Sequence, residues 1–165
     1  MVWYLIPGIV LQVIFPKLVE IYNQQKRYAY ILISRLFKLA LTISIVGAIL
    51  VSLESKSIIN IIFGTSYEKA SSILSIHIFG GVIVFVGSVW SSWILIENQQ
   101  KIFVYAHLVT TLVNISLGLL LIPKFHAEGA AIAAVVSFYS GQVVGFFLYK
   151  PRVIFSMIFM NIKKA

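Results

Sequence analysis

The sequence of 165 residues contains no cysteine and no aspartate. Without cysteine the chain can form no disulfide, no thiolate metal site and no thiol nucleophile. Its five acidic residues are all glutamates, and each lies at or outside the boundary of an apolar run. Carboxylates buried inside a membrane commonly mark ion and proton pathways. A cation- or proton-coupled site built on such carboxylates is therefore not expected here.

Charged residues are also scarce, at 11%, whereas 60% of the residues are hydrophobic and the mean hydropathy is +0.99. A typical soluble domain has about 45–50% apolar and about 25% charged residues. The natural solvent for this chain is therefore a lipid bilayer. The net charge of +8 comes from bases at the ends of apolar runs, with no contiguous basic stripe. Membrane lipids and an anionic substrate are the expected partners, and nucleic acid is not.

Four apolar runs approach the roughly 20 residues that a spanning helix needs. Lipid offers no partner for open backbone groups, so the expected fold is all-α, a polytopic membrane helix bundle. The run 1–15 is too short to cross unaided and suggests the end of a span, and hence a fragment or an internal start. We expect one membrane domain over 1–165, with a partial span 1–15, a cytoplasmic loop 16–35, spans 36–53, 71–96, 102–122 and 129–149, and a C-terminal segment 151–162.

The distribution of Lys and Arg predicts the orientation of the chain. If 16–35 is cytoplasmic, ten of the thirteen bases lie inside, and only Lys56, Lys69 and Lys124 lie outside. The C-terminus is then cytoplasmic as well. The segment 151–162 is apolar, flanked by bases and too short to span, which fits either an interfacial helix or a frayed tail.

The span 129–149 carries a repeat of small residues at every fourth position. Such spacing forms a groove along a helix in which a second helix can approach closely. The expected role is helix packing, with direct substrate contact as the alternative. The residues are Gly129, Ala133, Ser137, Gly141 and Gly145.

Two bases, Arg35 and Lys38, lie at the start of the span 36–53. Buried in a cavity, the pair would attract an anionic headgroup. The alternative is that both side chains extend to the cytoplasmic interface and bind nothing in particular.

Three polar residues within the spans are further candidates for lining a substrate path: His77, His107 and Asn114. The two histidines are expected at different heights, so a shared metal site is not predicted. Each histidine is interpreted as a lining or packing residue, with a proton relay as the alternative. Asn114, and more weakly Gln142, are expected to form hydrogen bonds between helices.

Aromatic residues near the span ends are interpreted as interfacial anchors, in preference to a stacking platform. They are Trp3, Trp90, Trp93, Tyr67, Tyr105 and Tyr149. No phosphate-binding glycine loop, paired-carboxylate site or supported Ser/His/Asp arrangement is found in the sequence. Neither an enzyme activity nor a cofactor is therefore expected.

Three stretches resemble polysaccharide exporters. Residues 62–70 resemble their Phe-Gly-x-x-Tyr-x-x-Ala loop, and residues 114–133 resemble their pattern of Asn, then Leu-Ile-Pro, then Gly-Ala-Ala. Residues 15–18 resemble the end of an earlier span. Together these look like the C-terminal part of an O-antigen flippase of the Wzx type, in the multidrug/oligosaccharidyl-lipid/polysaccharide exporter superfamily. One departure is His126, where relatives often have glycine, which puts the conformation of that loop in doubt.

The resemblance implies two six-helix bundles around a central cavity that opens alternately to each side of the inner membrane. This chain would then supply the end of the eighth helix and helices nine to twelve. The implied function is translocation of an undecaprenyl-pyrophosphate-linked oligosaccharide, the O-antigen repeat unit. The implied partners are the missing N-terminal helices or other polysaccharide-assembly proteins.

Two alternatives remain open. In the first, the chain is a truncated or split membrane module that transports nothing alone, because four spans cannot form both walls of such a cavity. In the second, it belongs to a multidrug antiporter of the same superfamily, against which the missing intramembrane carboxylates argue.

Overall fold

The computed structural model describes residues 5–149, and these residues are almost entirely helical. This confirms the all-α membrane bundle, since α1, α2, α4 and α5 are each long and apolar enough to cross a membrane. The expected C-terminal segment 151–162 and Trp3 lie outside the described residues. The elements are α1 (Leu5–Gln24), α2 (Lys26–Leu53), α3 (Ser55–Phe63), the 3-10 helix η2 (Thr65–Tyr67), α4 (Ala70–Ile96) and α5 (Lys101–Leu148).

The polar stretch 16–35, expected to be a loop, is helical on both sides of Gln25. Gln25 alone leaves helical geometry, with φ −146° and ψ 88°. Gln, Lys and Arg are good helix formers, so polarity by itself did not require a loop. With 28 residues, α2 is about 42 Å long, whereas the hydrocarbon core is about 30 Å thick. The first turns of α2 therefore extend beyond the apolar run 36–53.

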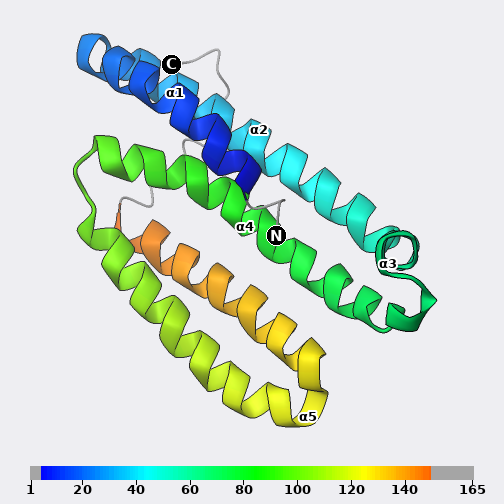
Figure 1. The fold of residues 1–165 in the computed structure, drawn as a ribbon. Helices are drawn as coiled ribbons and strands as arrows, with labels where there is room; N and C mark the ends of the chain where they lie inside the picture. Colours follow the sequence, from blue (N-terminus) through cyan, green and yellow to red (C-terminus); the bar gives the residue numbers. More distant parts are fainter. Residues whose placement is uncertain (1–4, 150–165) are drawn as a thin grey trace.

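Helix α5 is a hairpin of two limbs, residues 101–125 and 127–148, which Figure 1 shows folding back on each other. The reversal occurs at His126, whose φ of 51° and ψ of −125° are not helical. A positive φ suits glycine and is uncommon for residues that carry a Cβ. A glycine would adopt this backbone more easily than the histidine found here.

Helix α4 is the centre of the bundle. It contacts α1, α2 and α3 as well as α5. In Figure 1, α1 and α2 lie along one side of α4 and the α5 hairpin lies along the other. This position explains why α4 contains more buried residues than any other described helix.

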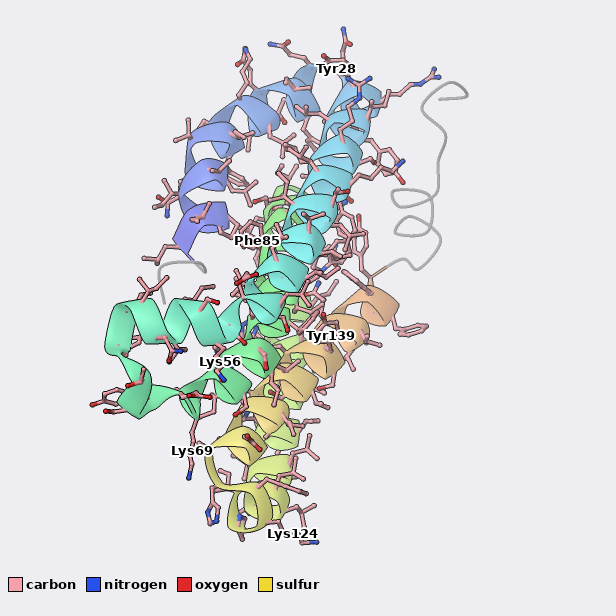
Figure 2. All side chains as sticks on the ribbon, turned by 90° about the vertical axis from the view of Figure 1, so that its right-hand side faces the viewer. Tyr28, Lys56, Lys69, Phe85, Lys124 and Tyr139 are labelled. Atoms are coloured by element: carbon pink, nitrogen blue, oxygen red, sulfur yellow. The ribbon has the colours of Figure 1, made fainter. Side chains whose placement is uncertain are left out.

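The three bases that the sequence predicts to lie outside the cytoplasm gather at one end of the bundle. Lys56, Lys69 and Lys124 all lie toward the end opposite Tyr28 (Figure 2). Three segments distant in sequence thus present their bases at the same end, as a bundle of spans with alternating direction requires.

The conformation of the loop with the exporter-like motif, residues 62–70, follows from local features of the chain. Helix α3 ends at Gly64, whose φ of +86° lies in the region that favours glycine. The chain then turns through η2, so that the rings of Phe63 and Tyr67 lie with centroids 6.1 Å apart. An ion pair between Lys56 and Glu68, with nitrogen and oxygen 2.6 Å apart, joins α3 to the segment after η2.

An aromatic cluster holds the helices together at the other end of the bundle. The ring of Trp93 meets those of Tyr22 and Tyr30 edge-on, at 5.8 and 5.9 Å. Its indole Nε1 donates a hydrogen bond of 3.1 Å to the hydroxyl of Tyr149. The hydroxyl of Tyr22 donates one of 2.8 Å to Glu97. Trp93 therefore links α1, α2, α4 and the end of α5.

The interpretation of Trp90 and Trp93 as interfacial anchors needs correction. Their exposed fractions are only 3% and 4%, because α1, α2 and the second limb of α5 pack over them. Tyr67 and Tyr105, at 60% and 57%, are exposed as an anchor requires. Hydropathy placed the tryptophans near a span end but could not say which way they face.

Candidate functional site

A groove of about 510 Å³ runs between α4 and the two limbs of α5. Each of the three helical segments contributes both small and polar side chains to it. The lining residues are Ile83, Val84, Gly87, Ser88, Trp90 and Ser91 of α4, Ile102, Phe103, Ala106, His107 and Thr110 of the first limb, and Phe138, Gly141, Gln142 and Gly145 of the second.

The hydroxyl groups of the groove are tied to their own helices. Ser88 donates to the carbonyl of Val84 at 2.6 Å, and Ser91 donates to that of Ser88 at 2.8 Å. Thr110 donates to the carbonyl of Ala106 at 3.0 Å. Each hydroxyl hydrogen is thus used within its helix, and the oxygen lone pairs are left as acceptors.

His107 also lines the groove, and its ring is tied to its own helix. Its Nδ1 lies 2.7 Å from the carbonyl of Phe103. Since a carbonyl only accepts, Nδ1 carries the proton in this contact. In the neutral imidazole Nε2 is then the acceptor.

Gln142 is the principal amide of the groove. Its Nε2 is fully buried and has no hydrogen-bond partner. Its Oε1 packs against Gly87, where an added Cβ would lie only 3.0 Å from it. No lining residue is formally charged. The groove therefore combines a mostly apolar lining with a few uncharged polar groups.

The five small residues of the second limb are all buried, and they form a seam with the first limb. A Cβ added at Gly141 would clash with the Thr110 side chain and lie 2.7 Å from the Ala106 carbonyl. One at Gly129 would collide with the backbone of Leu121. Close approach of the limbs thus requires glycine at these positions.

Asn114 completes the seam. Its Nδ2 donates a hydrogen bond of 3.2 Å to the hydroxyl of Ser137 on the other limb. Ser137 in turn donates to the carbonyl of Ala134 at 2.8 Å. This places Asn114 between the limbs and outside the set of groove-lining residues.

The remaining candidates lie elsewhere. Arg35 is exposed and Lys38 half-buried, one helical turn apart on α2. His77 is half-buried on α4, ahead of the part that lines the groove. Of the five expected substrate-binding residues, only His107 lines the groove, so the structure does not bring the five together.

A second groove, of about 310 Å³, lies between α2, α4 and the second limb of α5. It is apolar apart from Tyr139, whose hydroxyl donates to the carbonyl of Phe79 at 3.3 Å. The two grooves therefore differ sharply in chemistry. Within residues 5–149, no group of three histidines or carboxylates is placed to hold a metal ion.

Sequence reasoning missed Ser88, Ser91 and Thr110 as groove residues and underrated Gln142. The available signal in the sequence is the set of small residues Gly87, Ser88, Ser91 and Ser92 in α4. What distinguishes a lining serine from a packing serine is the position of the facing helix, and a single sequence does not contain it.

The chain shows sequence similarity to known proteins. The family model described as "Lipid II flippase MurJ" matches residues 5–164. The chain is 24% identical over 140 residues to the capsular polysaccharide biosynthesis protein CapF of Staphylococcus aureus, covering 84% of this chain and 35% of that protein. It thus spans about a third of the length of this relative. No solved structure matches the chain at a significant level.

Proposed function

The chain belongs to the family of the lipid II flippase MurJ, and on this basis we propose that it takes part in moving a lipid-linked oligosaccharide across the bacterial inner membrane. The match over residues 5–164 carries the proposal. The name of CapF, which places that relative in capsular polysaccharide biosynthesis, supports a polysaccharide precursor as the cargo. In its finer form, the proposed cargo is an undecaprenyl-pyrophosphate-linked repeat unit such as that of an O-antigen.

The chemistry of the chain suits such a cargo. Sugars need polar groups along their path, which the groove between α4 and α5 offers. A pyrophosphate needs cations, for which Arg35 and Lys38 are the proposed residues. The lipid can stay in contact with apolar surfaces such as those of Val13 and Leu119, which are largely exposed.

We expect the chain to act together with further membrane helices. Its relative is more than twice as long, and the groove between α4 and α5 is not enclosed within the described residues. A second helical wall would close a passage over it. Other polysaccharide-assembly proteins are the alternative partners.

The proposed orientation has the C-terminus in the cytoplasm and the end with Lys56, Lys69 and Lys124 in the periplasm. Because the chain lacks cysteine, single substitutions report position cleanly. In intact cells, a membrane-impermeant maleimide is expected to label Ser66→Cys between α3 and α4, but not Gln99→Cys between α4 and α5. Both residues are exposed. Labelling of Gln99→Cys before the membrane is permeabilised would contradict this orientation and indicate the opposite one.

The transport proposal is tested in a strain lacking its own O-antigen flippase. The chain is expressed alone or with the N-terminal two thirds of a full-length flippase, and surface polysaccharide is measured. We expect restoration only with the partner. Restoration by the chain alone would contradict the need for a second wall. If the chain inserts into the membrane but restores no surface polysaccharide, either alone or with the partner, the transport proposal is contradicted.

Neutralising the proposed cations gives the residue-level test. A base near an anionic headgroup contributes about 1 kcal/mol, so the double variant Arg35→Gln/Lys38→Gln is expected to lower restored polysaccharide roughly tenfold or more. The charge-preserving variant Arg35→Lys/Lys38→Arg and the distant Lys124→Gln serve as controls and should stay near the parent level. Equal loss in Lys124→Gln would assign the effect to overall charge.

A further inference from the structure

Helix α3 runs across the bundle, whereas the long helices run along it. Figure 1 looks nearly down the axis of α3, and Figure 2 shows α3 crossing the direction of α2. It begins at Ser55, directly after α2 ends at Leu53. Because α2 is long and apolar enough to span the membrane, α3 lies roughly parallel to the bilayer plane, at the level where the chain leaves the hydrocarbon core.

The nine residues of α3 divide into an apolar and a polar side. Positions three and four residues apart share one side of a helix. Three isoleucines have this spacing, and they are Ile58, Ile61 and Ile62. Three polar residues have it on the opposite side, and they are Lys56, Ser57 and Asn60. A helix divided in this way that lies in the membrane plane has the pattern of an interfacial helix.

Protein covers only part of the apolar side of α3. The helix contacts α4 and buries Ile59. Ile61 and Ile62, by contrast, are 84% and 64% exposed. Leu53 at the end of α2 is 76% exposed as well, so uncovered apolar side chains extend from the span into α3. Contiguous apolar surface of this kind marks a place where a membrane or another protein binds.

The residue types favour lipid over another helix as the cover for this surface. Helix contacts inside membranes favour small residues, as in the seam of α5. The exposed apolar side chains at α3 are all large, and they are Leu53, Ile61, Ile62 and Phe63. Tyr67, which follows in η2, is also exposed, and tyrosine is enriched at the boundary between membrane and water.

The charges of this segment do not select a particular headgroup. Residues 54–70 contain two glutamates and two lysines, and Lys56 forms an ion pair with Glu68. Attraction to anionic lipids needs an excess of bases. The contact with lipid therefore depends on the apolar side chains.

We propose that α3 is an interfacial helix that inserts Ile61 and Ile62 into the lipid, on the periplasmic side in the orientation given above. Its partner is the phospholipid surface, and the inference does not depend on which substrate the chain moves. The ion pair between Lys56 and Glu68 ties α3 to the segment that leads into α4. Insertion of α3 thus helps to fix the level of α4 in the bilayer.

The test measures the depth of single spin labels on the full chain in nanodiscs. The chain lacks cysteine, so each variant carries one nitroxide. Oxygen concentrates in lipid and a neutral nickel chelate in water, and the ratio of their accessibilities reports depth. Labels at Ile61→Cys and Ile62→Cys are expected about 5–10 Å below the headgroup boundary. A label at Ser57→Cys, on the polar side, is expected to give the aqueous ratio.

Two further sites calibrate the ratio. Leu50→Cys, exposed on α2, is the lipid reference, and Gln99→Cys, exposed between α4 and α5, is the water reference. The ratios at Ile61→Cys and Ile62→Cys should be severalfold above that at Gln99→Cys. They should be the same in phosphatidylcholine and in phosphatidylglycerol, because the segment carries no excess of bases.

Three results would overturn the proposal. Nickel accessibility at Ile61→Cys and Ile62→Cys equal to that at Gln99→Cys would place α3 in water. Low accessibility to both reagents at these two sites would mean that protein, such as a second copy of the chain, covers them. Insertion in phosphatidylglycerol alone would assign the contact to charge. Each of these results leaves the flippase proposal standing, because that proposal rests on the family match.

Discussion

Replacing Gly141 with alanine is expected to lower the free energy of unfolding by about 2–3 kcal/mol, the upper part of the range for overpacking a tight interior. The new Cβ would collide with the side chain of Thr110 and lie 2.7 Å from the carbonyl oxygen of Ala106. The carbonyl belongs to helical backbone and cannot turn away. The two limbs of α5 must therefore separate, which also loosens the hydrogen bond between Asn114 and Ser137.

Gly118→Ala is the matched control for this prediction. Gly118 is also buried in α5, but an added Cβ there would meet only Cδ1 of Ile122, at 3.6 Å. That is an ordinary contact with a flexible side chain, so we expect no loss, or a gain of up to about 1 kcal/mol from helix propensity. Unfolding in detergent is followed by circular dichroism. Similar losses in both variants would mean that the seam is not specially tight.

Replacing Trp93 with alanine is expected to have the larger effect, a loss of about 3–5 kcal/mol in the free energy of unfolding, as for other large buried aromatics. The side chain is 4% exposed and packs against Tyr22 of α1 and Tyr30 of α2. It also donates to the hydroxyl of Tyr149. Its removal therefore opens a cavity where four helical segments meet and leaves the Tyr149 hydroxyl without this donor.

Two variants separate the contributions of Trp93. Trp93→Phe keeps an aromatic ring but loses the indole N–H, so it should recover much of the stability and remain about 1 kcal/mol or more below the parent. Tyr105→Ala removes an aromatic side chain that is 57% exposed on α5 and should change the unfolding free energy little. A loss in Tyr105→Ala as large as that in Trp93→Ala would contradict the central role of the cluster.

Several features of the fold were predictable from one sequence because they follow from local physics. Hydropathy and run length predict membrane helices without reference to neighbours. The spacing from Gly129 to Gly145 puts small residues along one line of a helix, and such a line permits close packing wherever it meets a partner. Asn114, polar in mid-span, required a hydrogen-bond partner, and Ser137 is that partner.

Other features depended on the facing helix. Residues 16–35 are polar enough for a loop, yet α1 and α2 continue through them, because packing between these helices adds to their helix propensity. Trp90 and Trp93 have the composition and position of interfacial anchors, but they turn inward against α1, α2 and α5. The direction of a side chain around a helix has functional meaning only once a neighbour occupies that side.

By itself, the sequence determined that this protein resides in a lipid bilayer and that it crosses the bilayer as helices, since both depend on summed hydropathy. The distribution of its bases predicts the orientation. Only the tertiary structure decided that the α5 limbs close on a glycine seam, that Trp93 joins four segments, and that Gln142 lies at a groove between α4 and α5. These three depend on distances between residues far apart in the chain, which composition and spacing do not contain.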